Sequence, residues 1–226
     1  MTTWFITGTG TDIGKTVFTS LFAKFLNEKN ISITTQKWVQ TGTETNDDID
    51  ITTHDKAFKK SPSTIPDSHQ KARMPYAFPL PASAHLAAKE QNILIDPEKI
   101  KQCLRFLEKN YDHVIVEGLG GIMVPITQEL TSLDLVDQLR LETIIVVPNI
   151  LGAINHALLT IQALASRQIS IRGFVMNQID STVNTLIQND NPRIIQYLSG
   201  LPCIGNINQN KVLTFTDTFI NSLNLD

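Results

Sequence analysis

Apolar and polar positions form alternating blocks along this chain of 226 residues, and the blocks predict strands and helices in turn. Short runs rich in β-branched residues, such as 114–116, are typical of strands buried on both faces. Segments with apolar residues three or four positions apart, such as 17–26, are typical of amphipathic helices. We expect strands at 4–6, 31–37, 114–116, 143–148, 171–176 and 201–207, and helices from 15 to about 30 and at 83–91, 96–110, 155–165 and 192–199.

Strands that alternate with helices favour one parallel sheet with helices on both faces. We therefore predict a single α/β domain over residues 1–226, with about seven strands and with 201–207 as the last of them. Three stretches depart from the regular pattern. The segment 40–55 is polar and predicts a loop, 56–81 holds five prolines and predicts irregular chain, and 211–226 has only a weakly helical apolar spacing.

The loop that joins the first strand to the first helix contains three glycines between Thr7 and Gly14. Such a loop points backbone N–H groups at an anion, and the positive end of the helix dipole favours phosphate at the same place. Lys15 would then reach the β- and γ-phosphates, and the Thr16 hydroxyl would bind Mg²⁺. The usual P-loop has its first glycine at Thr9, whereas this chain has glycines on either side of it. The sequence predicts a triphosphate site in a P-loop NTPase-like sheet; the alternative is a glycine-rich turn with a surface lysine.

Two charged residues stand at the ends of predicted strands, where ligands bind in open parallel sheets. Lys37 ends the second strand, and Glu117 follows the run 114–116 and leads into the glycine-rich stretch Gly118, Leu119, Gly120, Gly121. A carboxylate at Glu117 would occupy the place of a Walker B acid, within reach of Mg²⁺. Lys37 could instead be a solvated lysine, and the stretch after Glu117 could be an ordinary flexible turn.

Other polar positions are compatible with the same edge. Asp47, Asp48, Asp50 and Asp55 cluster in the polar stretch; they form either a solvated loop or, in part, a metal site. Asn177 ends a strand and could read a purine edge, because its amide offers a donor and an acceptor. Gly152, at the start of a helix, frees N–H groups for an anion, while His156 more often caps or packs than catalyses.

Composition narrows the class of protein. The chain is 42% hydrophobic with a net charge of -3 and a pI near 5.9, which disfavours nucleic acid as a partner. Cys103 and Cys203 are too few for a disulfide framework and suit a reducing compartment. No apolar run reaches the ~18 residues of a membrane span, so we expect a cytoplasmic protein that does not enter a membrane.

With these motifs in place, the chain resembles the dethiobiotin synthetase family, the P-loop enzymes that close the ureido ring in biotin biosynthesis. The displaced P-loop glycine is also a feature of that family. The matching stretches occur in the family's order from Gly8 to Asn177: GTGTDIGKT, Lys37 followed by WVQTG, PYAFPLPASAH, VEGLGG, LGAINHALLT and FVMN.

The resemblance implies a cyclo-ligase that uses ATP and Mg²⁺ to carboxylate 7,8-diaminononanoate with CO₂. One amine captures CO₂ as a carbamate, ATP phosphorylates the carbamate to a carbamic-phosphoric anhydride, and the second amine attacks with loss of phosphate. The products are dethiobiotin, ADP and phosphate. The protein's contribution would be positioning and charge stabilisation.

The resemblance also implies roles for individual residues in a homodimer whose diamine lies across the interface. Lys15 and Lys37 would be catalytic, holding the γ-phosphoryl and carbamate oxygens. Thr16, Asp48 and Glu117 would bind Mg²⁺, with Asp47 or Asp50 as alternatives to Asp48. Thr41 would contact the substrate, as would Gly152, Ala153, Ile154 and Asn155 of the partner subunit. Nucleotide contacts would come from Asp12, Ile13, Gly14, Lys15, Thr16, Val17, Asp48, Glu117, Gly118, Leu119, Gly120, Asn177, Gln178, Asn208, Gln209 and Asn210.

Some features leave alternatives open. Relatives commonly have a basic residue where this chain has Ile150, and many read Gly-x-Ile-Pro where it has Asn208. The stretch 177–180 reads NQID, one residue from the guanine-reading pattern NKxD, but without the lysine ATP is favoured. Two other functions are conceivable, amidation of a carboxylate on a larger cofactor and a partitioning-type ATPase switch. The first would bring a longer chain, and the second a lysine where this chain has Gly10.

Overall fold

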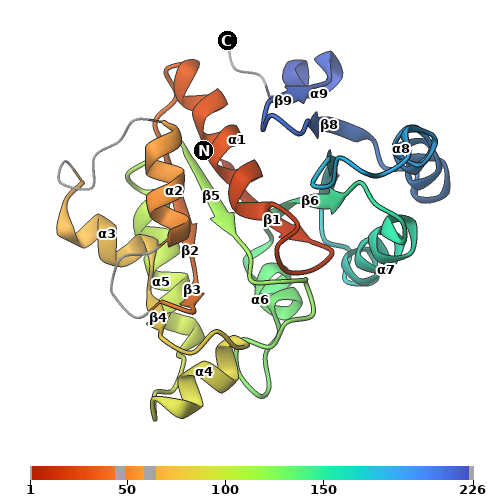
Figure 1. The fold of residues 1–226 in the computed structure, drawn as a ribbon. Coiled ribbons are helices and arrows are strands. Elements are labelled where there is room, and N and C mark those ends of the chain that lie inside the picture. Colours follow the sequence, from red (N-terminus) through yellow and green to blue (C-terminus); the bar gives the residue numbers. More distant parts are fainter. Residues whose placement is uncertain (1, 44–48, 59–64, 224–226) are drawn as a thin grey trace.

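A seven-stranded sheet forms the centre of the computed structural model, which describes residues 2–43, 49–58 and 65–223 (Figure 1). The strand order is β2-β5-β1-β6-β7-β8-β9, and every neighbouring pair is parallel except β8 and β9. The expected parallel sheet is thus confirmed. The strands are β1 (Thr2–Gly8), β2 (Ile33–Lys37), β5 (His113–Glu117), β6 (Glu142–Pro148), β7 (Ile171–Asn177), β8 (Cys203–Ile207) and β9 (Leu213–Phe215).

Helices cover both faces of this sheet, because successive side chains of a buried strand point to opposite sides. Along β1, Trp4 and Ile6 enter one apolar layer and Phe5 enters the other. The first layer packs against α1 (Lys15–Glu28) and α9 (Asp217–Ser222). The second packs against α5 (Pro97–Glu108), α6 (Ser132–Leu139), α7 (Ala153–Ser166) and α8 (Thr185–Ser199).

The segment between β2 and β5 builds a flank beside the sheet. It contains α2 (Ile49–Ala57), which packs against α1, and α3 (Asp67–Arg73), which packs against α5. A second, two-stranded sheet pairs β3 (Val39–Thr41) with β4 (Tyr76–Phe78) in parallel, and α4 (Ala84–Glu90) lies against β3. This flank lies beside the end of β2, opposite the side on which β2 pairs with β5 (Figure 1). Lys37 is the last residue of β2.

Several sequence predictions are wrong in this flank and near the C-terminus. The polar stretch 40–55 contains most of α2, and the proline-rich stretch 56–81 contains α3 and β4. The helix α6 was not predicted, although Thr131 and Asp134 cap it reciprocally. The helix α8 begins at Thr185 rather than at Pro192, because Asn184 caps its first turn.

The last strand is also different from the prediction. β8 is followed by β9, whose antiparallel pairing starts at a tight turn, so 201–207 does not end the sheet. Ser83 does occupy the N-cap of α4, but its side chain makes no capping hydrogen bond there. No helix in the described ranges has the length and apolar character needed to cross a bilayer.

Candidate active site

The loop between β1 and α1 is shaped by one glycine and held by one distant side chain. Gly14 is the N-cap of α1 and has a φ of 94°, in the left-handed region that disfavours residues with a Cβ. The Asn177 amide at the end of β7 donates through Nδ2 to the Ile13 carbonyl at 2.9 Å. A Cβ at Gly14 would collide with that amide. The loop therefore requires glycine at this position.

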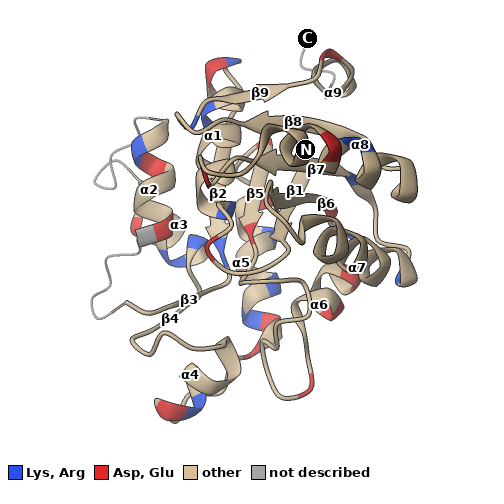
Figure 2. Ribbon diagram, turned by 45° about the vertical axis from the view of Figure 1, so that its right-hand side comes forward, with Lys and Arg blue, Asp and Glu red and all other residues tan. Residues whose placement is uncertain are grey.

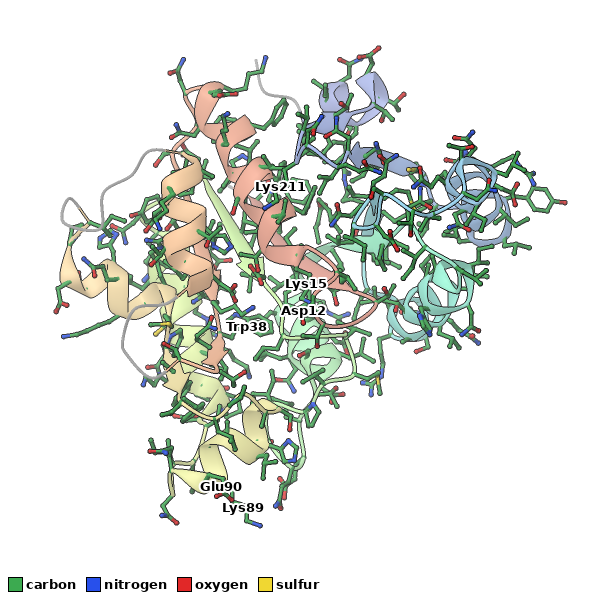
Figure 3. The ribbon with its side chains drawn as sticks, in the orientation of Figure 1. Asp12, Lys15, Trp38, Lys89, Glu90 and Lys211 are labelled. Atoms are coloured by element: carbon green, nitrogen blue, oxygen red, sulfur yellow. The ribbon has the colours of Figure 1, made fainter. Side chains whose placement is uncertain are left out.

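Lys15 is the first residue of α1 and follows directly on the loop that contains Asp12 (Figure 3). Its Nζ donates to the Gly10 carbonyl at 2.6 Å, and the residue is only 6% exposed. Burial, and then repulsion from Lys37, lower the pKa of Lys15 to about 8. A bound phosphate would favour its charged form.

Lys37 and Glu117 meet because β2 and β5 are parallel neighbours with these two residues in register. Lys37 Nζ donates to Glu117 Oε1 at 2.7 Å and to the Gly118 carbonyl at 3.2 Å, and it lies 3.0 Å from Asp50 Oδ2. Both members of the pair are almost fully buried. The carboxyl ends of the two strands thus place a cation and an anion next to the phosphate loop.

The pKa values of this pair shift in opposite directions. Burial alone would lower the pKa of Lys37, but the carboxylates of Glu117 and Asp50 hold it well above its usual range. Burial alone would raise the pKa of Glu117, but the Lys37 ammonium and a hydrogen bond from His54 hold it well below its usual range. Both side chains are therefore charged at neutral pH.

Thr16, Asp50 and Glu117 form a cluster of oxygen atoms beside the loop. Thr16 Oγ1 is 2.9 Å from Glu117 Oε1 and 2.9 Å from Asp50 Oδ1. Hard oxygen donors of this kind suit Mg²⁺, which takes one or two carboxylates and completes its shell with waters and substrate phosphates. In the described ranges no three His, Cys, Asp or Glu side chains group to hold a metal by themselves. The cluster therefore suits a cation that takes some of its ligands from these protein oxygens and the others from a phosphate and from water.

Sequence reasoning assigned a metal-binding role to Asp48, which lies outside the described residues. Asp50, which was named as an alternative to Asp48, lies on the first turn of α2 at the oxygen cluster. One turn further along α2, His54 Nε2 is 2.8 Å from Glu117 Oε2. The sequence did not indicate this histidine. The i, i+4 spacing of Asp50 and His54 would have been informative only once α2 was recognised as a helix.

The remaining residues that were predicted to contact nucleotide follow the carboxyl ends of parallel strands, at the same edge of the sheet as the phosphate loop. The side chains of Ile13 and Leu119 are buried in the apolar layers, and Val17 packs against one of them. The backbone N–H of Gln178 donates to the Ile207 carbonyl at 2.9 Å.

Residues 208–210 lie in the connection between β8 and β9, which runs from 208 to 212. There Asn208 Oδ1 accepts from the backbone of Asn210 and of Val212, each at 3.0 Å. The side-chain oxygen of Asn208 therefore stabilises the turn through hydrogen bonds to its backbone. The loop after β5 lies next to the phosphate loop, because β5 and β1 are neighbouring strands. A Cβ added at Gly120 would lie 3.4 Å from Thr11 Oγ1.

The predicted substrate residues fall in two separate places. Thr41 ends β3 on the flank beside β2. Gly152, Ala153, Ile154 and Asn155 form the first turn of α7, after β6, with Gly152 as a left-handed N-cap. Figure 1 shows β3 and α7 on opposite sides of the phosphate loop, and Figure 2 shows the same two elements apart from each other. One chain does not bring the two sets together.

This geometry defines the class of protein: a P-loop nucleotide-binding protein with a parallel sheet. Solved structures agree with that fold, among them a ParA family ATPase from Chlorobium tepidum, with a TM-score of 0.58 and 19% identity over 98% of this chain and 88% of that one. Another is FlhF complexed with GMPPNP and Mg²⁺, with a TM-score of 0.54 and 14% identity over 99% of this chain and 73% of that one. A family model described as an AAA domain matches residues 2–216.

Curated relatives narrow the class. An ATP-dependent dethiobiotin synthetase from Pasteurella multocida is 37% identical over 86% of this chain and 90% of its own. The corresponding enzyme of Thermodesulfovibrio yellowstonii is 32% identical over 89% of this chain and 86% of its own. The chain belongs to the dethiobiotin synthetase family of ATP-dependent ligases, and the family expected from the sequence motifs is confirmed.

Proposed function

We propose that this protein forms dethiobiotin from 7,8-diaminononanoate, CO₂ and ATP, with Mg²⁺ bound at the oxygen cluster. The observation that carries the proposal is the convergence of Lys37 Nζ and Thr16 Oγ1 on one oxygen of Glu117, at 2.7 and 2.9 Å, beside a phosphate-binding loop. A site that must bring a triphosphate and a small anion together needs cations and hard oxygen ligands at one point.

The reaction would proceed in three steps. One substrate amine attacks CO₂ and loses a proton to give a carbamate. A carbamate oxygen attacks the γ-phosphorus of ATP, the bond to the β-phosphate oxygen breaks, and ADP leaves. The second amine attacks the carbamoyl carbon of the resulting anhydride and loses a proton, and phosphate leaves as the ring closes.

Lys15 and Lys37 would bind the oxygens that carry charge through these steps. Lys15 sits in the phosphate loop and would contact the β- and γ-phosphates, whereas Lys37 approaches from β2 and would contact the γ-phosphoryl and carbamate oxygens. Thr16 and Glu117, with Asp48 or Asp50, would hold Mg²⁺, which neutralises charge on the phosphates when bound.

Residues at the carboxyl ends of β7 and β8 would select the nucleotide by recognising its base. Asn177 already touches the phosphate loop through Nδ2, which leaves its Oδ1 as the acceptor suited to the adenine amino group. Backbone groups of Gln178, Asn208, Gln209 and Asn210 line the same edge as Asn177, because Ile207 and Asn177 are in register.

The separation of the two substrate sets supports a homodimer. The diamine would contact Thr41 of one protomer, while Gly152–Asn155 of the partner subunit would bind its carboxylate with helix-start amides. Leu151 and Leu159, before and within α7, are 82% and 57% exposed, as expected for an interface. We propose further that residues 1–226 act as one domain and that the protein works in the cytoplasm.

The test is incubation of the purified protein with ATP, Mg²⁺, bicarbonate and 7,8-diaminononanoate. We expect ADP in proportion to dethiobiotin identified by mass spectrometry, and neither product when the diamine is omitted. ADP that forms at the same rate without the diamine would contradict the proposal, as would a product lacking the added carbonyl carbon from ¹³C-bicarbonate.

A further inference from the structure

His54 is a fully buried side chain whose polar contact is made with the candidate metal site. Its exposed fraction is 0%, and its Nε2 lies 2.8 Å from Glu117 Oε2. Its other ring nitrogen, Nδ1, is buried without a hydrogen-bond partner in the part of the chain that the structure describes. Burying an unpaired polar atom costs about 1–3 kcal/mol. A packing role alone would be met better by leucine, so the histidine is explained by its contact with Glu117.

The two oxygens of Glu117 therefore have different partners. Oε1 faces Lys37 and Thr16, at 2.7 and 2.9 Å, on the side of the phosphate loop. Oε2 accepts from His54 Nε2 on α2, and Nε2 must carry the ring hydrogen because a carboxylate offers none. The carboxylate cannot rotate without losing hydrogen bonds on both sides.

The helix that carries His54 is itself held in place. Asp55, the next residue on α2, forms a buried two-point ion pair with Arg73 of α3, at 2.7 and 2.9 Å. Arg73 also donates to the carbonyl and to the hydroxyl of Thr35 on β2, at 3.0 and 2.9 Å. His54 thus acts on Glu117 from a helix that is locked to the strand next to β5.

We propose that His54 is a positioning residue that keeps Oε2 of Glu117 occupied, so that the carboxylate presents Oε1 alone to the metal. This inference rests on the proposed metal site. A single oxygen per carboxylate suits Mg²⁺, which demands near-ideal octahedral geometry, whereas Ca²⁺ readily accepts both oxygens of a carboxylate. His54 would accordingly set the preference of the site for Mg²⁺ over Ca²⁺.

The experiment compares His54→Leu, which removes the N–H, with His54→Gln, whose amide can donate in its place. His113→Leu is the matched control, because His113 lies at the other end of the same strand, β5. Mn²⁺ affinity is measured by electron paramagnetic resonance in the presence of a non-hydrolysable ATP analogue, with Mg²⁺ and Ca²⁺ as competitors. Affinity for the analogue without metal is measured in parallel.

We expect His54→Leu to weaken Mg²⁺ binding about 10- to 100-fold, the usual effect of removing a partner of a metal ligand. Ca²⁺ binding should weaken less, so the ratio of the two affinities falls. His54→Gln should recover most of the loss, His113→Leu should stay within about twofold, and the analogue without metal should bind all variants alike.

Two results would overturn the inference: an unchanged metal affinity in His54→Leu, or equal losses in His54→Leu and His54→Gln, which would mean packing alone. Glu117→Gln separates this failure from failure of the metal site. If Glu117→Gln also binds metal normally, the proposed metal site is wrong and the inference about His54 is wrong with it.

If His54→Leu does not fold, ¹⁵N spectra of the histidines in the unchanged protein provide the test. Addition of Mg²⁺ with the analogue should shift the ring signals of His54 and not those of His113. Unshifted His54 signals would contradict the proposal.

Discussion

At the scale of single residues, Lys37 makes polar contacts with three groups of the site, two carboxylates and one backbone carbonyl. Its Nζ forms ion pairs with Glu117 and Asp50 at 2.7 and 3.0 Å and donates a hydrogen bond to the Gly118 carbonyl. Its charge is thus fixed by two carboxylates before any substrate arrives. A preorganised cation of this kind stabilises charge that develops during reaction without having to reorganise.

Replacement of Lys37 by alanine should therefore impair chemistry more than binding. We expect Lys37→Ala to lower kcat about 10²- to 10³-fold, a typical loss for one preorganised donor, with nucleotide affinity changed only a few-fold. Single-turnover ADP formation and equilibrium binding of an ATP analogue measure the two effects separately. Lys24→Ala, which removes an exposed lysine of α1 paired with Glu28 at 3.8 Å, is the control. Lost nucleotide binding with normal turnover would contradict the assigned role.

The sequence indicated some of these residues and not others for a physical reason. Lys37 and Glu117 stand directly after strands with clear apolar runs, so their position at the sheet edge follows from the parallel topology. His54 and Arg73 act across α2 and α3, and their partners are 63 and 18 residues away along the chain. Contacts of that kind depend on how elements pack, which local pattern does not specify.

At the scale of elements, the flank of α2 and α3 depends on a buried ion pair. Arg73 and Asp55 are 2% and 3% exposed, and removing one partner leaves the other charge buried without compensation. We expect Arg73→Met to lower the free energy of unfolding by about 3–5 kcal/mol. Urea titration followed by circular dichroism measures the change.

The same helix provides a control. Lys71 and Asp67 of α3 also form an ion pair, at 2.7 Å, but their side chains are 76% and 77% exposed. Lys71→Met should change stability by no more than about 0.5 kcal/mol, because exposed pairs contribute little. Equal losses in the two variants would show that Arg73 does not stabilise the flank through its buried charge.

The pairing of β1 with β5 brings a pH-sensitive contact to the opposite end of the sheet from the site. Trp4 Nε1 donates to His113 Nδ1 at 3.1 Å, and burial lowers the pKa of His113 below its ordinary 6.5. Below pH 6.5 the unfolded chain therefore binds more protons at this position than the folded one. Stability should fall as the pH drops from 6.5 through the lowered pKa of the folded state.

The prediction is that His113→Gln loses part of this acid-side dependence and keeps the same stability trend above pH 7. Urea unfolding between pH 5 and pH 8, followed by tryptophan fluorescence, measures it. Identical pH profiles for the variant and the unchanged protein would exclude His113 as a source of acid sensitivity.

Element boundaries show where local pattern was sufficient. The strands β5, β6 and β7 were predicted closely, because β-branched runs such as that in β6 are typical of strands buried on both faces. The helix α2 has a polar sequence with two adjacent threonines and little amphipathic character, so nothing local distinguishes it from a loop. It is held by its contacts with α1 and with the sheet edge, which are tertiary.

At the scale of the whole molecule, the parallel topology gathers the loops after β1, β2, β5 and β7 at one edge, and with them Lys15, Lys37, Glu117 and Asn177. Acidic and basic residues are interspersed along the surrounding helices (Figure 2). The first turn of α7 follows β6 at the same edge but lies across the phosphate loop from β3 (Figure 1). In the proposed homodimer, the first turn of α7 from a second copy of the chain would complete the proposed substrate site.

The decisive test of that arrangement is a charge placed on the exposed side of α7. Asn155 and Leu159 are exposed and lie four residues apart in α7, so they share one face of the helix, and the exposed Leu151 lies just before its N-terminus. We expect Leu159→Asp to convert a dimer into a monomer by light scattering and to abolish dethiobiotin formation, with the ATP analogue still bound. Leu94→Asp is the control, because Leu94 is 93% exposed but follows α4 at another end of the molecule. The dimer should dissociate because an unpaired aspartate buried at the interface would greatly weaken the affinity between the two chains. A fully active Leu159→Asp monomer would contradict the proposal, because it would show that one chain holds the complete diamine site.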